Sequence, residues 1–106
     1  MKIKWSSRAR QEWYQTLYRI NDEFGYYSAV KFRKETTTAT NQLKKFPKSG
    51  PPEDLLACAQ YEFRGILFAE YNKLIYYIAE DAIHIDDLWD TRCEPKTQAA
   101  ETLKNK

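Results

Sequence analysis

Two stretches in the first half of the chain carry apolar residues at the three- and four-residue spacing of amphipathic helices. The pair Ser6-Ser7 offers an N-cap before the first stretch, and Gly25 is a suitable stop after it. The second stretch ends at Pro47, which cannot continue a helix. The two stripes are Ala9, Trp13, Leu17, Ile20 and Phe24, and then Ala29, Phe32, Thr36, Ala39, Leu43 and Phe46. Because so few residues separate them, the sequence predicts an antiparallel helical hairpin with facing apolar stripes.

The second half changes to short runs of aromatic and β-branched residues, which are typical of strands. A loop rich in Pro and Gly at 47–52 separates it from the helices. The runs cover residues 61–63, 66–71, 74–79 and 82–89. The two-residue gaps Asn72-Lys73 and Glu80-Asp81 predict that the last three runs pair as an antiparallel three-stranded meander. Within the last run, Asp86-Asp87 interrupts the alternation, which indicates a β-bulge.

The two ends of the chain carry shorter patterns. Ile3 and Trp5 alternate with lysines, which predicts a short N-terminal strand. Residues 95–106 begin with Pro95, a favourable first helical residue, and predict a short C-terminal helix with Ala99, Ala100 and Leu103 as its apolar contacts. With 106 residues, the chain has the length of one domain. The sequence therefore predicts a single α+β domain over residues 1–106.

Charge divides the chain at the same loop. Residues 1–50 hold eleven Lys and Arg against four Asp and Glu, a net charge of +7. Residues 51–94 hold three against ten, a net charge of −7, and the last twelve residues add three bases and one acid. We therefore expect a basic helical hairpin and an acidic sheet.

The cysteines and the hydropathy favour a cytoplasmic protein. Cys58 and Cys93 form no CxxC or Cys/His pattern, which argues against a structural zinc. Cys58 lies in the apolar run 55–59, where we expect a small buried thiol. No apolar run approaches the roughly 18 residues that span a bilayer, and no signal peptide follows Met1. We expect reduced thiols, no membrane contact, no cofactor and no metal.

Few residues offer evident chemistry. His84, the single histidine, alternates with isoleucines and fits a solvent-facing strand position, with a catalytic role as the alternative. The densest carboxylate group is Asp86, Asp87 and Asp90. Because adjacent strand residues point to opposite faces, we expect a solvated acidic face rather than a metal site.

Two arginines stand in the acidic half. Arg64 begins a strand and Arg92 follows the last one, so a meander can bring both to the same end or face of the sheet. Ion pairing with Glu62, Asp87 or Asp90 is one interpretation. The other is a clamp for a phosphate or a carboxylate, and the sequence leaves both open.

Several loose motifs follow the predicted first strand, hairpin and Pro/Gly loop in order. They are the runs Tyr61–Phe68, Leu74–Ile78 and Ile83–Ile85, and the Asp-x-Arg-x-x-Pro turn at Asp90–Pro95. Over nearly its whole length the chain resembles the RelE/ParE superfamily of toxins from bacterial type II toxin–antitoxin modules. The resemblance implies a cytoplasmic toxin that inhibits growth, serves plasmid stabilization and is neutralised by a cognate antitoxin protein.

The resemblance implies one of two targets. ParE-like members inhibit DNA gyrase without obvious catalysis, whereas RelE-like members are ribosome-dependent mRNA endonucleases that use basic residues and a C-terminal Tyr, often with His. Arg64, Arg92 and Asp90 are the matching candidates for target binding.

The sequence after Arg92 favours the ParE-like alternative. It holds no Tyr or His, and Gln98, about where a nuclease would carry its tyrosine, is neither an acid nor a base. The acidic sheet also disfavours RNA binding. A nuclease would need a divergent site from Arg64, Arg92, Tyr71 and His84, with Tyr76 and Tyr77 nearby. The endonuclease and a non-toxic decayed interaction module are therefore the alternatives.

Overall fold

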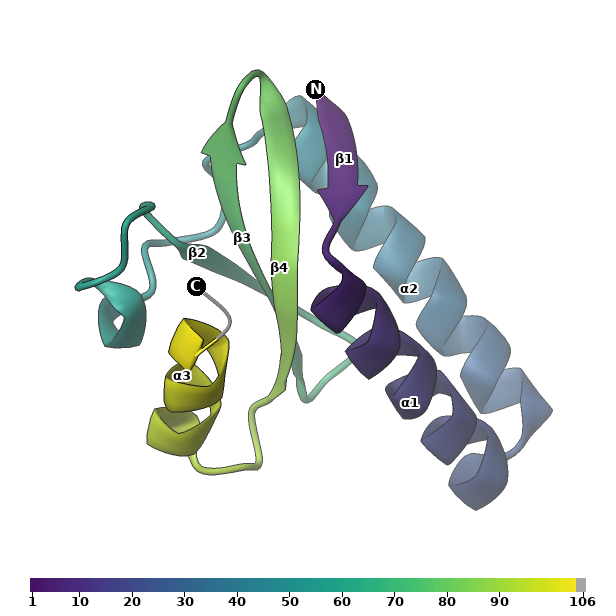
Figure 1. Ribbon diagram of the computed structural model, residues 1–106. Coiled ribbons are helices and arrows are strands. Elements are labelled where there is room, and N and C mark those ends of the chain that lie inside the picture. The colour runs from purple at the N-terminus through teal and green to yellow at the C-terminus, as the bar shows by residue number, and fades with distance from the viewer. Residues whose placement is uncertain (105–106) are drawn as a thin grey trace.

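A computed structural model describes residues 1–104, which fold into one sheet with helices on both faces (Figure 1). The elements are β1 (Lys2–Trp5), α1 (Ser7–Phe24), α2 (Tyr26–Lys45), the 3₁₀ turn η1 (Asp54–Leu56), β2 (Arg64–Phe68), β3 (Asn72–Ala79), β4 (Ala82–Asp90) and α3 (Pro95–Lys104). The predicted α+β class and the order of the elements are confirmed. Residues 105 and 106, which the predicted last helix included, lie outside the described residues.

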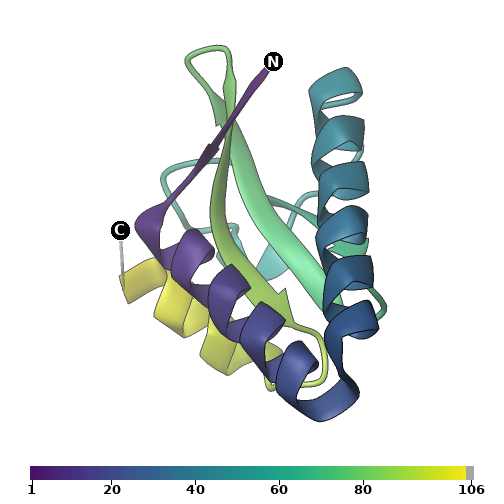
Figure 2. The same ribbon diagram turned by 90° about the vertical axis from the view of Figure 1, so that its right-hand side faces the viewer.

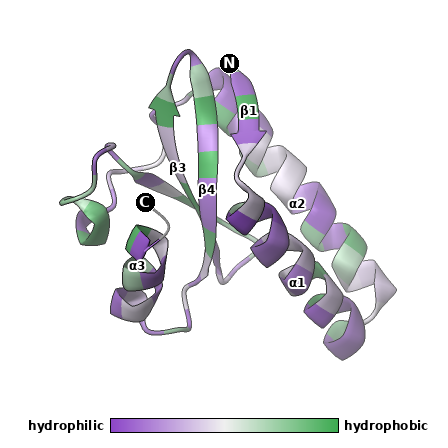
Figure 3. Ribbon diagram, viewed as in Figure 1, coloured by the Kyte–Doolittle hydropathy of each residue, from purple (hydrophilic) through white to green (hydrophobic). Residues whose placement is uncertain are grey.

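The sheet has four strands in the order β1-β4-β3-β2. The predicted meander is present, since β2 pairs with β3 and β3 with β4, both antiparallel. β1 adds a fourth strand, parallel to β4. Helices α1 and α2 lie on one face of the sheet and α3 lies on the other (Figure 2). Hydrophobic and hydrophilic residues alternate along β4 from Ile83 as far as Asp86 (Figure 3), because successive side chains of a strand point to opposite faces of the sheet.

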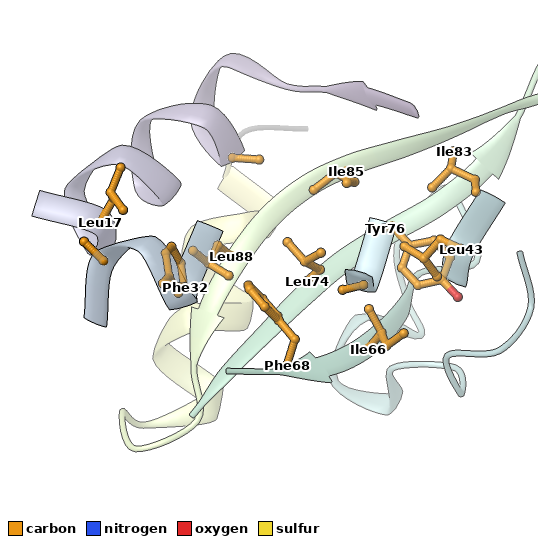
Figure 4. Close-up of a cluster of buried hydrophobic side chains, with 13 residues drawn as sticks. Leu17, Phe32, Leu43, Ile66, Phe68, Leu74, Tyr76, Ile83, Ile85 and Leu88 are labelled. Carbon is orange, nitrogen blue, oxygen red and sulfur yellow. The ribbon is translucent and has the colours of Figure 1, made fainter. Parts of the chain in front are cut away.

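The main core lies between the helical hairpin and the sheet (Figure 4). Ser6 caps α1 as predicted, since its Oγ accepts a hydrogen bond from the Ala9 backbone N–H at 3.0 Å. The buried members of the two predicted stripes are Ala9, Leu17, Ala29, Phe32, Thr36, Ala39 and Leu43. Phe24 and Phe46 are exposed because they stand at the far ends of the helices. No helix within residues 1–104 is long and apolar enough to cross a membrane.

The turn between β2 and β3 differs from the prediction. Asn72 and Lys73 belong to β3, and the chain reverses instead at residues 69–71. Ala69 and Glu70 adopt left-handed backbone angles there, with φ of 48° and 64°. Asn72 stabilises the turn through its side chain, whose Nδ2 donates to the Ala69 carbonyl at 3.1 Å. The predicted strand at 61–63 is also absent, since β2 begins at Arg64.

The turn between β3 and β4 lies where predicted and offers a test. Glu80 and Asp81 have φ of 54° and 59°, which side chains with a Cβ disfavour. Replacing the pair with Asn-Gly is expected to stabilise the domain by about 1 kcal/mol, because this dipeptide suits two left-handed positions. Urea unfolding of this variant against Glu80→Ala, which lacks the gain, measures the effect. An unchanged midpoint contradicts the prediction.

The predicted bulge is confirmed, but its carboxylates are buried and not exposed to solvent as predicted. Ile75 pairs with Asp87 while Tyr76 pairs with Ile85, so Asp86 is the extra residue. Asp86 and Asp87 are only 6% and 1% exposed, so the expected solvated acidic face is wrong here. The bulge turns Asp87 toward α3, which covers this face of the sheet.

A second, smaller core lies under α3. It consists of Leu56, Phe63, Ile75, Trp89 and Ala99. Leu56 is the buried residue of η1, whereas Cys58 just after it is exposed. The prediction of a buried Cys58 is therefore wrong, because a 3₁₀ turn and loop bury only part of this apolar run.

Candidate functional site

Arg92, Tyr71 and Asp90 meet at the end of the sheet where β4 finishes and β3 begins. Asp90 pairs in register with Asn72, which places the turn residue Tyr71 beside the segment after β4. The Thr91 backbone N–H donates to the Tyr71 carbonyl at 2.7 Å and fixes this contact. The Arg92 guanidinium carbon lies 4.8 Å from the centre of the Tyr71 ring, a cation–π arrangement.

Asp90 orients the same guanidinium. Its Oδ1 accepts from Arg92 Nε at 3.1 Å and its Oδ2 from Arg92 Nη2 at 3.0 Å, a bidentate pair. A second arginine, Arg19 of α1, approaches Asp90 Oδ2 at 3.9 Å. Gln98 of α3 holds the Asp90 backbone, since its Oε1 accepts from the Asp90 N–H at 2.8 Å and its Nε2 donates to the Asp90 carbonyl at 2.9 Å. Gln98 therefore has a structural role.

The arrangement is both ordered and accessible. The Arg92 side chain is 56% exposed and Tyr71 is 49% exposed. Both residues line a hollow of about 300 Å³ between the end of the hairpin where α1 turns into α2 and the β2–β3 turn. Arg19, Phe24 and Lys31 line it from the helices. The hollow presents three cations and the three carboxylates of Glu23, Glu35 and Glu70 beside apolar surface, a combination that suits a macromolecular partner.

The Arg92 pair controls the ionisation of Asp90. The hydrogen bond from the Arg92 side chain holds the pKa of Asp90 below its ordinary value of 3.8, although partial burial acts in the opposite direction. Because this pKa is lower in the folded state, the contribution of Asp90 to stability is present above about pH 4 and is lost as the pH falls through the folded pKa.

An NMR titration of the Asp90 carboxyl carbon tests this coupling. In Arg92→Ala the midpoint is expected to rise toward the ordinary carboxyl value, because the charged donor is gone. Lys104→Ala removes one exposed positive charge from α3 and should leave the midpoint unchanged. A midpoint that is the same in Arg92→Ala and the unaltered protein contradicts the assignment.

The structure does not bring Arg64 to Arg92. Arg64 pairs in register with Tyr76, at the opposite end of β2 from the turn that carries Tyr71. Its side chain is 15% exposed, and it donates to the Gly50 carbonyl at 2.8 Å and to Glu62 Oε1 at 2.7 Å. The ion pair with Glu62 that the sequence suggested is thus present, and Arg64 fastens the loop before the meander.

The remaining candidates lie elsewhere on the sheet. Tyr76 is buried in the main core, where its hydroxyl donates to the Pro47 carbonyl at 2.7 Å and accepts from the Gly50 N–H at 3.0 Å. His84 stacks on Tyr77 on the opposite face, and its Nε2 lies 3.1 Å from the Ala79 carbonyl oxygen. Within residues 1–104 no three His, Cys, Asp or Glu side chains gather closely enough to hold a metal ion.

A second accessible surface, on the helical hairpin, was missed in the sequence. Tyr14 and Tyr18 of α1 are exposed and stack with their centroids 6.3 Å apart. Near the tip, Tyr26 and Tyr27 are 69% and 86% exposed. We call this set, together with Phe24, the hairpin aromatic surface. The signal was available, since Tyr14 and Tyr18 follow each other at i and i+4 outside the predicted buried stripe.

The strand order, the hairpin and the C-terminal helix define an α+β fold that is shared with a solved toxin–antitoxin structure. A chain of the "Chromosomal ParDE TA system from P. aeruginosa" matches with a TM-score of 0.68 and 13% sequence identity, covering 85% of this chain and 95% of that chain. By sequence, no protein-family model and no curated protein matches. The ParE-like fold expected from the sequence is therefore confirmed.

Proposed function

We propose that this protein is the toxin of a bacterial type II toxin–antitoxin module, which inhibits growth by binding DNA gyrase and is neutralised by a cognate antitoxin. The observation that carries the proposal is the shared fold with a ParDE-system chain, which extends over 95% of that chain. A fold alone does not specify a target, so the surfaces of this chain supply the remaining support. The proposed target contact is the Arg92, Tyr71 and Asp90 site, with the toxin acting in the cytoplasm.

The hairpin aromatic surface supports the antitoxin part of the proposal. Tyr14 and Tyr18 form one exposed aromatic pair on the hairpin and Tyr26 and Tyr27 form another near its tip, and exposed apolar patches mark protein interaction sites. Residues 7–45 of the hairpin also hold eight Lys and Arg against four Asp and Glu, and Arg33 lies 5.8 Å from the centre of the Trp13 ring. An acidic segment with apolar side chains complements this surface.

The positions of the sheet residues favour target binding over RNA cleavage. Proton transfer needs an acid or base with a pKa near neutrality. Burial raises the pKa of Tyr77, and the nearby Tyr61, Asp86 and Glu80 raise it further. The Tyr77 phenol therefore stays protonated at neutral pH and is unsuited to act as a general base. Gln98 hydrogen-bonds the Asp90 backbone, and Arg64 is engaged by Gly50 and Glu62. Arg92 alone among these candidates combines charge with high exposure.

Two assays with the same purified protein test the target. The expected result is inhibition of supercoiling by gyrase, with messenger RNA left intact on translating ribosomes. Cleaved messenger RNA with normal supercoiling would overturn the proposal and favour a RelE-like endonuclease. Induced expression that leaves growth unaffected would instead indicate a non-toxic decayed module. Co-expression of the neighbouring reading frame should restore growth if that frame encodes the antitoxin.

A further inference from the structure

Three rings from separate segments form one stack on the sheet face opposite the helical hairpin. Tyr77 of β3 stands directly across from His84 of β4, with ring centroids 4.8 Å apart and planes at 5°. Tyr61, in the loop before β2, stacks on Tyr77 with centroids 4.0 Å apart and planes at 9°. Since Tyr77 lies between two parallel rings, Tyr61 is a terminal ring of the stack.

Tyr61 is held rigidly but not covered. The buried ring of Phe63 packs perpendicular to both tyrosines. Its centroid lies 6.5 Å from that of Tyr61 with the planes at 89°, and 5.3 Å from that of Tyr77 with the planes at 82°. One face of Tyr61 is covered by Tyr77, yet the residue keeps 37% of its surface exposed. The outer face is therefore available to a further planar group, without a side chain having to be ordered first.

The charge at the Tyr61 end of the stack favours a cation. Lys4 of β1 stands across from His84 at the other end of the stack, and the buried Asp86 and Asp87 supply two of the ten carboxylates in residues 51–94, so the exposed acids nearer Tyr61 decide the preference. Glu80 and Asp81 are exposed in the turn beside the stacked strands, and Glu62 follows Tyr61 directly, with Arg64 as its partner. The face of a phenol ring is itself electron-rich and attracts cations. A nucleotide would bring phosphate into this acidic neighbourhood and be repelled.

We propose that the outer face of Tyr61 is a binding platform for the guanidinium group of an arginine side chain on a peptide partner. A guanidinium is planar, stacks on aromatic faces and remains charged under all physiological conditions. The chain already makes this contact internally, with Arg92 over Tyr71 at 4.8 Å and Arg33 over Trp13 at 5.8 Å. The proposal is independent of the toxin assignment, because it rests on the stack and its charge.

An NMR titration with blocked peptides tests the platform. The probe is acetyl-Gly-Arg-Gly-Arg-Gly-amide, compared with the same peptide carrying lysine and with AMP. The arginine peptide is expected to shift the Tyr61 ring protons saturably, with its own δ-methylene protons moving upfield in the ring current. The lysine peptide should bind at least about threefold more weakly, since an ammonium does not stack.

Two variants separate the platform from general charge attraction. Tyr61→Leu is expected to abolish the saturable shifts, whereas Tyr27→Leu, which removes a more exposed tyrosine from the hairpin, should retain them. Unchanged amide signals elsewhere in Tyr61→Leu show that the domain is folded. Saturation by AMP instead of the arginine peptide, equal binding to Tyr61→Leu, or no saturable shift each overturns the proposal.

Discussion

Replacing Asp87 with asparagine is expected to destabilise the domain by about 2 to 4 kcal/mol, one of the largest losses for a single polar side chain in this fold. The Asp87 side chain is 2% exposed, and its Oδ2 accepts from Arg8 Nε at 3.0 Å and from Thr102 Oγ1 at 2.5 Å. Its Oδ1 accepts from the Leu88 backbone N–H at 2.8 Å. Asparagine keeps the shape but turns an N–H₂ donor toward donors, or leaves the Leu88 N–H without an acceptor.

The cost stays below that of a fully buried ion pair because the Arg8 side chain is 30% exposed and can regain water. Thermal unfolding should show a fall in the midpoint of roughly 10 to 20 °C for a chain of this size. Asp22→Asn, which changes an exposed carboxylate of α1, is the matched control and should unfold within about 2 °C of the unaltered protein. Equal midpoints for the two variants would show that the Asp87 network adds nothing to stability.

For Asp87, the local backbone could be predicted from the sequence, but the hydrogen-bond partners could not. The bulge at Asp86-Asp87 was predictable, because a break in strand alternation is a local signal. The partners of Asp87 were not, because Arg8 is 79 residues away and its position depends on β1 lying parallel to β4. The parallel pairing is a tertiary outcome that no periodicity in the short first strand specifies.

The candidate site shows the same division. The helical stripes and the stop at Gly25 follow from spacing, and the structure contains them. The contact between Tyr71 and Arg92 depends on the register of the meander, and the predicted turn at Asn72-Lys73 displaced that register. In the structure the turn places Ala69 and Glu70 in left-handed conformations. Glycine usually occupies such positions, and because neither residue is a glycine, the sequence did not indicate a turn there. Tertiary pairing therefore decided which candidate residues meet.

Replacing Arg92 with alanine is expected to abolish growth arrest while the domain remains folded. The Arg92 side chain is held by surface contacts with Asp90 and Tyr71, so its removal opens no cavity in either core. As the exposed guanidinium of the proposed site, it has the properties of an interface residue whose loss weakens binding by roughly thirtyfold or more. Colony counts after induction and gyrase inhibition by the purified variant measure the two consequences.

Arg92→Lys separates charge from geometry at this position. Lysine keeps the positive charge but loses the bidentate pair with Asp90 and the planar stack on Tyr71, so a partial recovery of toxicity is expected. Lys104→Ala, which removes an exposed charge from α3, should arrest growth like the unaltered protein. Full toxicity in a folded Arg92→Ala variant would show that the arginine is only a surface ion pair. Loss of toxicity in both Arg92→Ala and Lys104→Ala would show that overall charge, rather than this oriented guanidinium, governs the interaction.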